Sequence, residues 1–258
     1  MKAHLILIFS LLAIFLFFGC KREAKKVENS SDSVNVWPEE IEEVMPEYFS
    51  SDLKWQDLFG DVEYAVTESS DYDLADALLI DSLRFNEAGM VTLLDYSILS
   101  EGEKITDLSA KIYYDGNGNF LRAQDAVSPE VKITLSRSEE GDLETITYSY
   151  PEGMEGTETF FRNSLGLVER NENRGHEYKG IKTFKYDENG RLIKIIEKRY
   201  YIGEESIIEE EIEYLEFDDK GNWIERKLSG ERSIKVEGEA PVKDHVERVQ
   251  KRRIKYRN

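Results

Sequence analysis

The chain has 258 residues and is strongly acidic, with 53 Asp and Glu against 34 Lys and Arg and a formal net charge of −19. This balance argues against nucleic-acid binding, because Lys and Arg must replace the counterions of the phosphates. The sequence contains one Cys, which excludes an intramolecular disulfide, so an exported domain would depend on its packed core for stability.

The first twenty residues, MKAHLILIFSLLAIFLFFGC, read as an export signal. The basic residue Lys2 precedes an apolar run from Leu5 to Phe18, which is short for a membrane span of ~20 apolar residues. The Gly-Cys ending resembles bacterial lipoprotein signals, in which the Cys becomes the acylated first residue of the mature chain. The resemblance implies a signal peptide at 1–19 and lipidation at Cys20, with an anchor helix or an ordinary signal as alternatives.

Residues 20–50 are expected to form a tether between the lipid and the folded domain. The stretch from 21 to 35 is polar and lacks apolar periodicity, which favours a flexible spacer. Its first part, KREAKK at 21–26, also suits contact with anionic headgroups. The following WPEEIEEVMPEYF at 37–49 predicts a short helix, because Pro38 and the acids after it suit a first helical turn.

The remaining residues, 51–258, are interpreted as one repeat domain with a recurring turn signal. KYDENGRL at 185–192 is the clearest copy. Each copy has Asp, Asn or Ser three residues before a Gly, and an apolar residue two after it. The six pairs are Asn86 and Gly89, Asp115 and Gly118, Ser138 and Gly141, Asn163 and Gly166, Asp187 and Gly190, and Asp218 and Gly221.

This pattern predicts tight turns between strands. The first side chain can accept hydrogen bonds from the backbone two residues on, and Gly supplies a positive φ. The intervening segments are rich in Ile, Val, Thr, Tyr and Phe, which favour strands. Turn glycines 23 to 31 residues apart fit one hairpin per repeat. The predicted fold is all-β, an antiparallel meander of repeated β-hairpins forming a twisted, open or partly curled sheet.

An open sheet has two free edges, and the basic last strand, RVQKRRIKYRN at 248–258, is expected to blunt one of them. It is also a candidate partner for the acidic strand at 207–217, since opposite charges across strands attract. The repeat aromatics are expected in the core of the sheet: Tyr114, Tyr186, Phe217 and Trp223. Of the adjacent Tyr200 and Tyr201, which point to opposite faces, one is expected to be exposed.

No residue pattern predicts catalysis, a cofactor or a metal. DGNGN at 115–119 begins like an EF-hand loop, but Phe120 and Ala126 occupy the positions of its required Gly and Glu. The three His lack zinc-ligand spacing, and no Gly-x-Ser-x-Gly or phosphate loop is present. A carboxylate pair of the glycosidase kind stays open, because many acids are available.

Tyr-Asp-x-x-Gly-x-Leu, as in YDENGRL, resembles the YD (RHS-type) repeat of bacterial surface and secreted proteins. The layout is similar to that of small bacterial envelope lipoproteins with degenerate copies of this repeat. The matching stretches are LFGDVEYAVTESSDYD at 58–73, DDKGNWIERK at 218–227 and ERVQKRRIKY at 247–256. The resemblance implies antiparallel β structure and brings no catalytic residues.

The sequence thus favours a noncatalytic binding or surface-presentation module of the bacterial cell envelope. A lipid at Cys20 would anchor it, with the outer membrane as the expected location, on the periplasmic or the surface face. The expected partners are the membrane, through the lipid, and a protein or glycan. An envelope hydrolase with an unrecognised carboxylate site and a purely structural spacer are the alternatives.

Overall fold

The computed structural model describes residues 52–53, 56–70, 77–138, 143–151 and 153–257. The predicted signal peptide, the tether with its helix at 37–49, and the repeat glycine Gly141 lie outside these residues. The described chain is all-β and every strand pair is antiparallel, as the sequence predicts. No helix in this part of the chain is both long and apolar enough to cross a membrane.

Fourteen strands make up the fold within the described residues. They are β1 (Val62–Ser70), β2 (Leu78–Phe85), β3 (Val91–Ser100), β4 (Glu103–Tyr114), β5 (Phe120–Asp125), β6 (Lys132–Arg137), β7 (Leu143–Ser149), β8 (Glu155–Arg162), β9 (Val168–Arg174), β10 (Tyr178–Tyr186), β11 (Leu192–Tyr201), β12 (Glu204–Phe217), β13 (Trp223–Val236) and β14 (Val242–Tyr256).

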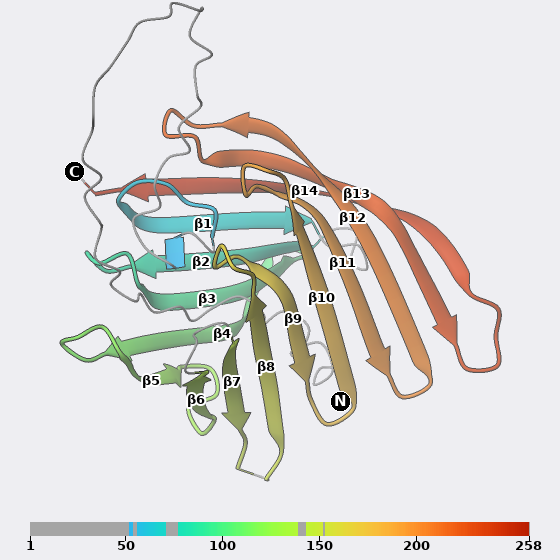
Figure 1. Ribbon diagram of the computed structural model, residues 1–258. Coiled ribbons are helices and arrows are strands. Elements are labelled where there is room, and N and C mark those ends of the chain that lie inside the picture. The colour runs from blue at the N-terminus through green and yellow to red at the C-terminus, as the bar shows by residue number, and fades with distance from the viewer. Residues whose placement is uncertain (1–51, 54–55, 71–76, 139–142, 152, 258) are drawn as a thin grey trace, which may run out of the picture.

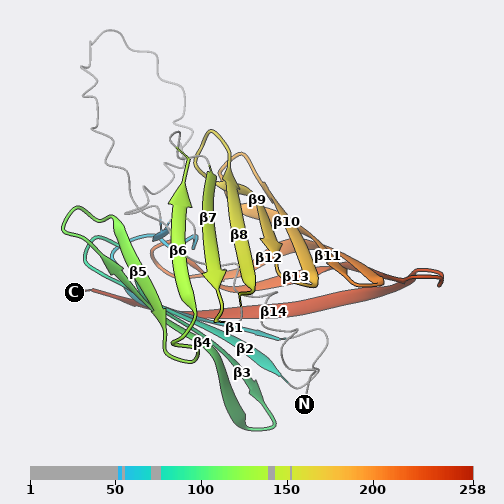
Figure 2. The ribbon, with the colours of Figure 1, turned by 90° about the horizontal axis from the view of Figure 1, so that it is seen from below.

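The strands follow one another in chain order around a closed barrel, because each pairs with its sequence neighbours and β1 also pairs with β14 (Figures 1 and 2). The meander of hairpins is therefore confirmed, but the prediction of an open or partly curled sheet is wrong. Strands in a sheet are rotated by about 20–25° relative to their neighbours, and a long meander can use that twist to bring its ends together. Closure removes both free edges.

Complementary charges line the seam between β1 and β14. Lys255 lies 2.7 Å from the carboxylate of Glu63, and Arg253 lies 2.7 Å from that of Glu68. The basic last strand therefore does not blunt an edge, and β12 is not its neighbour in the barrel, although its Arg248 donates to the carboxylate of Glu210 on β12 across β13. It pairs with β13 on one side and with the acidic residues of β1 on the other.

The hydrophobic core lies inside the barrel, mainly against β1–β9. It includes Leu83, Leu94, Ile146 and Phe160, each between 0 and 7% exposed. The facing strands are unequal in length: β5 and β6 have 6 residues, whereas β12–β14 have 14 or 15. The long β13–β14 hairpin consequently projects beyond the shorter strands, at the right of Figures 1 and 2.

Candidate functional site

The predicted turn residues gather at one end of the barrel, which we call the Gly-turn end. In the clearest copy, Asp187 Oδ1 accepts hydrogen bonds from the backbone N–H groups of Asn189 (3.0 Å) and Arg191 (2.8 Å), and Gly190 has φ 76°. The same two hydrogen bonds are made by the side chains of Asn86, Asp115, Asn163 and Asp218. In the remaining copy, Ser138 Oγ accepts a hydrogen bond from Leu143 N. A positive φ, between 72° and 83°, is found at Gly89, Gly118, Gly166 and Gly221.

The repeat tyrosines connect neighbouring hairpins through their hydroxyl groups. Tyr186 donates to the carbonyl of Val168 at 2.8 Å, and Tyr114 donates to that of Val91. Each carbonyl belongs to the residue two after the preceding repeat glycine, so the aromatic position fixes the register between successive copies. The hydroxyl groups of these tyrosines are therefore engaged in hydrogen bonds that hold the barrel together, and we do not assign them to a functional site.

The prediction that all four repeat aromatics lie in the core is wrong for Phe217. Trp223 is 1% exposed and faces inward, but Phe217 is 37% exposed. The cause is an irregularity in the pairing of β12 with β13 between Tyr214 and Phe217, which breaks the alternation of the strand. Phe217 stacks on Tyr214 instead, with ring centroids 5.6 Å apart.

The short segment before β1 closes part of the Gly-turn end. Leu53 and Leu58 are completely buried there. Asp52 Oδ2 accepts from Val91 N at 2.8 Å, which joins the segment to β3. The side chain of Asn222, in the turn before β13, accepts from the backbone N–H of Phe59 and donates to its carbonyl at 3.1 Å. The segment thus bridges distant parts of the barrel wall.

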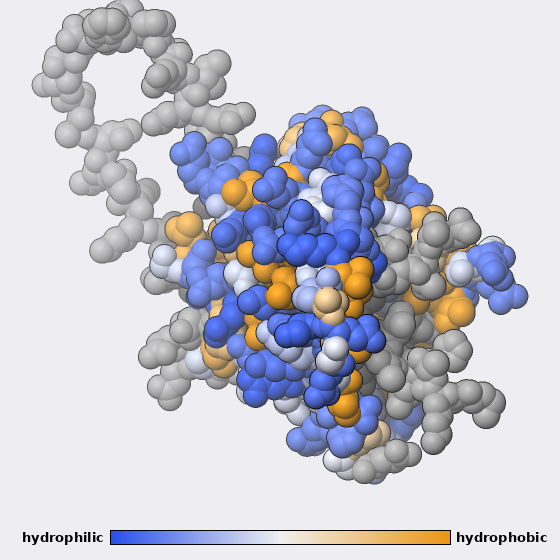
Figure 3. Space-filling view, turned by 90° about the vertical axis from the view of Figure 1, so that its right-hand side faces the viewer, coloured by the Kyte–Doolittle hydropathy of each residue, from blue (hydrophilic) through white to orange (hydrophobic). Residues whose placement is uncertain are grey.

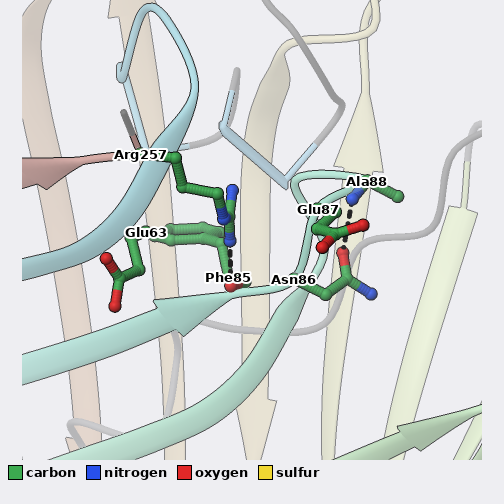
Figure 4. Close-up of a pocket in the computed structure, with 6 residues that line it drawn as sticks. All are labelled: Glu63, Phe85, Asn86, Glu87, Ala88 and Arg257. Carbon is green, nitrogen blue, oxygen red and sulfur yellow. Dashed lines mark hydrogen bonds between the residues drawn. The ribbon is translucent and has the colours of Figure 1, made fainter.

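A shallow depression of about 710 Å³ lies near this end, between the start of β1, the β2–β3 turn and the last residues (Figure 4). Its basic residue, Arg257, donates to the carbonyl of Phe85 and also holds Asp61 and the carbonyl of Val62. Asn86 is occupied by its own turn (Figure 4). Arg257 and Asn86 are therefore engaged in hydrogen bonds within the fold, and we do not assign a ligand site to the depression.

The inner face of β10–β14 carries a cluster of charged groups that sequence reasoning missed. Away from the hairpin tips, this face has six basic and three acidic side chains. We call them the inner cluster, and they are Lys182, Glu197, Arg199, Glu210, Arg226, Arg232, Asp244, Arg248 and Arg252. Several keep accessible surface although they point inward: the side chains of Lys182, Arg199 and Arg248 are 18 to 22% exposed.

Each acid of the inner cluster is paired with an arginine. Arg199 donates to both carboxylate oxygens of Glu197, at 2.9 and 3.1 Å, and Lys182 lies 3.6 Å from the same carboxylate. Arg248 makes an equivalent pair of bonds to Glu210. Burial alone would raise the pKa of Glu197, but Lys182 and Arg199 outweigh it and lower that pKa to about 2. This carboxylate is therefore ionised at neutral pH.

Two carboxyl groups from other strands face this cluster, and their pKa values are shifted the opposite way. Burial raises the pKa of Asp81 on β2 to about 7 and that of Glu158 on β8 to about 8, and Lys182 opposes both shifts. Asn171 donates to Glu158 Oε1 at 3.0 Å, while Oε2 has no partner among the described residues. Glu158 is therefore mostly protonated at neutral pH.

Two arginines of the cluster lie over the buried ring of Trp223. The guanidinium carbon is 4.0 Å from the ring centroid for Arg226 and 3.6 Å for Arg252. The indole Nε1 is buried and has no hydrogen-bond acceptor in the described part of the chain. Trp223 belongs to the Asp-x-x-Gly-Asn-Trp stretch at 218–223, so a motif marked its position, but no local signal indicated the two arginines.

The remaining candidate residues do not form a site. His176 and His245 are exposed, and no group of three or more potential metal ligands occurs among the described residues. Tyr201 faces inward and packs on Tyr178 with ring centroids 5.0 Å apart, while Tyr200 points outward and is half-buried.

Fold and site together define a closed antiparallel β-barrel with an inner surface that is apolar on one side and charged on the other. No protein-family model matches the chain, and no curated protein matches it. Among solved structures, the chain is similar to a porin-like protein from Bacteroides uniformis ATCC 8492, with 11% identity and a TM-score of 0.45. The similarity covers 75% of this chain and 98% of that one, and it carries no function across.

Proposed function

We propose that this chain is a noncatalytic, lipid-anchored protein of the bacterial envelope whose barrel binds a small anionic ligand on its inner surface. Export and acylation at Cys20 would attach it to the outer membrane, and the barrel would be the binding module. The observation that carries the binding role is the excess of basic groups in the inner cluster.

The charge count explains why an anion is the expected ligand. Arg199, Arg232 and Arg248 each contact a carboxylate, which uses all three acids of the inner cluster. Lys182 shares a carboxylate with Arg199, and the arginines over Trp223 add two further positive charges. An inward-facing excess of positive charge in a chain of net charge −19 is a local reversal, and it would attract and hold an anion.

The outer face of the barrel supports an anchor separate from the barrel itself. A lipid-facing barrel carries an apolar band about 25 Å tall. Here the outer face of β11–β14 carries ion pairs, such as Lys227 with Glu247 at 2.6 Å and Lys251 with Glu225 at 3.2 Å. On the one face that Figure 3 shows, the described residues are mainly hydrophilic, and hydrophobic residues are scattered among them. We therefore assign membrane attachment to the lipid.

The binding role is tested by calorimetric titration of the full-length protein with citrate and with inorganic phosphate. We expect saturable binding of at least one anion, weakened by Lys182→Gln, which removes an inward charge. Lys185→Gln changes an exposed lysine on the same strand and should bind like the wild type. If neither anion binds, the proposal is contradicted and the role of a structural spacer remains.

One observation favours an envelope hydrolase as a second candidate. Asp81, with a pKa of about 7, has the protonation behaviour that suits a general acid or base, and part of its surface is accessible. Glu158 is a poor catalytic partner because it is fully buried. Hydrolysis of chromogenic glycosides by the wild type, lost in Asp81→Asn, would favour this alternative.

A further inference from the structure

The two arginines over Trp223 differ from the other arginines of the inner cluster in their hydrogen-bond partners. Arg199, Arg232 and Arg248 each bind a carboxylate. Arg226 Nε donates to Gln250 Oε1 at 2.6 Å. Among the described residues, Arg252 donates to the hydroxyl of Thr67 and to the backbone carbonyls of residues 56 and 57. Both guanidiniums therefore have neutral acceptors.

The close approach of two such cations is electrostatically unfavourable. Burial lowers the pKa of each guanidinium, and the neighbouring arginine lowers that of Arg252 further, to about 9. The Trp223 ring offsets part of this cost through its electron-rich face, and Asp57 and Tyr214 act favourably on both cations. An anion in contact with both guanidiniums would remove the repulsion directly.

The hydrogen-bond groups at this place also favour an anion. Among the described residues, the two guanidiniums and the indole N–H of Trp223 supply more donors than the surrounding oxygens accept, with the hydroxyl of Tyr214 as a further acceptor for Arg226. Guanidinium groups bind carboxylate and phosphate oxygens through paired N–H donors. Arg252 is buried, whereas Arg226, on the inner face of β13, is only partly buried, and we expect a ligand to approach from the side of Arg226.

We propose that Arg226 and Arg252, held over Trp223, bind the oxyanion group, carboxylate or phosphate, of a small ligand. This proposal rests on the proposed function, because it places the anion at one point of the inner cluster. The remaining basic residues of the cluster then contribute to the field that attracts the ligand, since their own hydrogen bonds go to carboxylates.

The test compares the dissociation constants of citrate and inorganic phosphate for the full-length wild type, Arg226→Gln and Lys227→Gln. Lys227 is the next residue on β13 and points outward, so it is a matched control. We expect Arg226→Gln to weaken binding by about 10- to 100-fold, as for the loss of a hydrogen bond to a charged group, and Lys227→Gln by less than about 2-fold. If only citrate binds, the site is a carboxylate site, and if only phosphate binds, it is a phosphate site.

A second readout leaves Arg226 and Arg252 unchanged. In a protein with Trp37→Phe and Trp55→Phe, Trp223 is the remaining tryptophan, and its fluorescence should change as the anion saturates the site. One result would overturn this site and leave the proposed function standing. In that result the anion binds and Lys182→Gln weakens its binding, but the Trp223 emission does not change and Arg226→Gln binds the anion with unchanged affinity. Absence of binding by both anions would overturn both.

Discussion

Glu158→Gln should make the barrel more stable at alkaline pH and should leave its stability unchanged in acid relative to the wild type. Glu158 is completely buried, and it accepts a hydrogen bond from Asn171. A Gln side chain keeps an oxygen for that bond and never ionises. The substitution therefore removes the cost of burying a carboxylate and preserves the packing.

The magnitude follows from the pKa of Glu158, which is about 8 in the folded protein against an ordinary value of 4.5. Below pH 4.5 both states hold the proton, so the group does not affect stability. Between pH 4.5 and 8 the unfolded chain loses the proton and the folded one keeps it, so stability falls by about 1.4 kcal/mol per pH unit. Above pH 8 the full cost is about 5 kcal/mol.

Urea unfolding of the wild type and of Glu158→Gln at pH 4.5, 6.5 and 8.5 measures this difference. The free energy of unfolding of the variant should exceed that of the wild type by an amount that grows with pH. Glu188→Gln, at an exposed turn position, is the control for a general effect of removing one acid. Parallel pH profiles for the wild type and Glu158→Gln would refute the reasoning.

Three further predictions concern a turn, an ion pair and the anchor. Gly118→Val should lower the free energy of unfolding by about 1–3 kcal/mol, because Gly118 has φ 83°. Gly116→Val, in open space in the same turn, should lower it by less. Equal losses of the two variants in urea unfolding would argue against backbone strain. Arg199→Met should destabilise by about 3–5 kcal/mol because it removes both hydrogen bonds of the arginine to the buried carboxylate of Glu197. Glu197→Gln in the same chain should recover part of the loss, as measured by thermal unfolding. Cys20→Ser should release the protein from the membrane fraction, and a variant that stays membrane-bound with unchanged processing would exclude lipidation.

The local structure was predictable because its interactions are short in sequence. Asp187 binds backbone groups two and four residues away, and the strands on either side pair through the turn that it stabilises. The same logic predicted the positive φ of Gly190. The irregular pairing that exposes Phe217 was not predictable, because it depends on how two long strands align across the barrel.

The inner cluster was not predictable because charged residues occupy both faces of the same strands. On β13, Arg226 points inward and Lys227 outward, and nothing in the sequence distinguishes them. The raised pKa of Asp81 likewise depends on burial inside a closed wall. An open sheet would have left this carboxyl in water.

The sequence by itself determined the class of fold, the repeat turns and the order of the hairpins, since these depend on hydrogen bonds and side-chain patterns within a few residues of chain. Only the tertiary structure decided that the sheet closes, which face becomes the interior, and which charges meet there. Arg252 reaches Thr67 across 185 residues of chain. Contacts of that range exist because the last strand pairs with the first, and closure also buries the charges that give the barrel its proposed binding role.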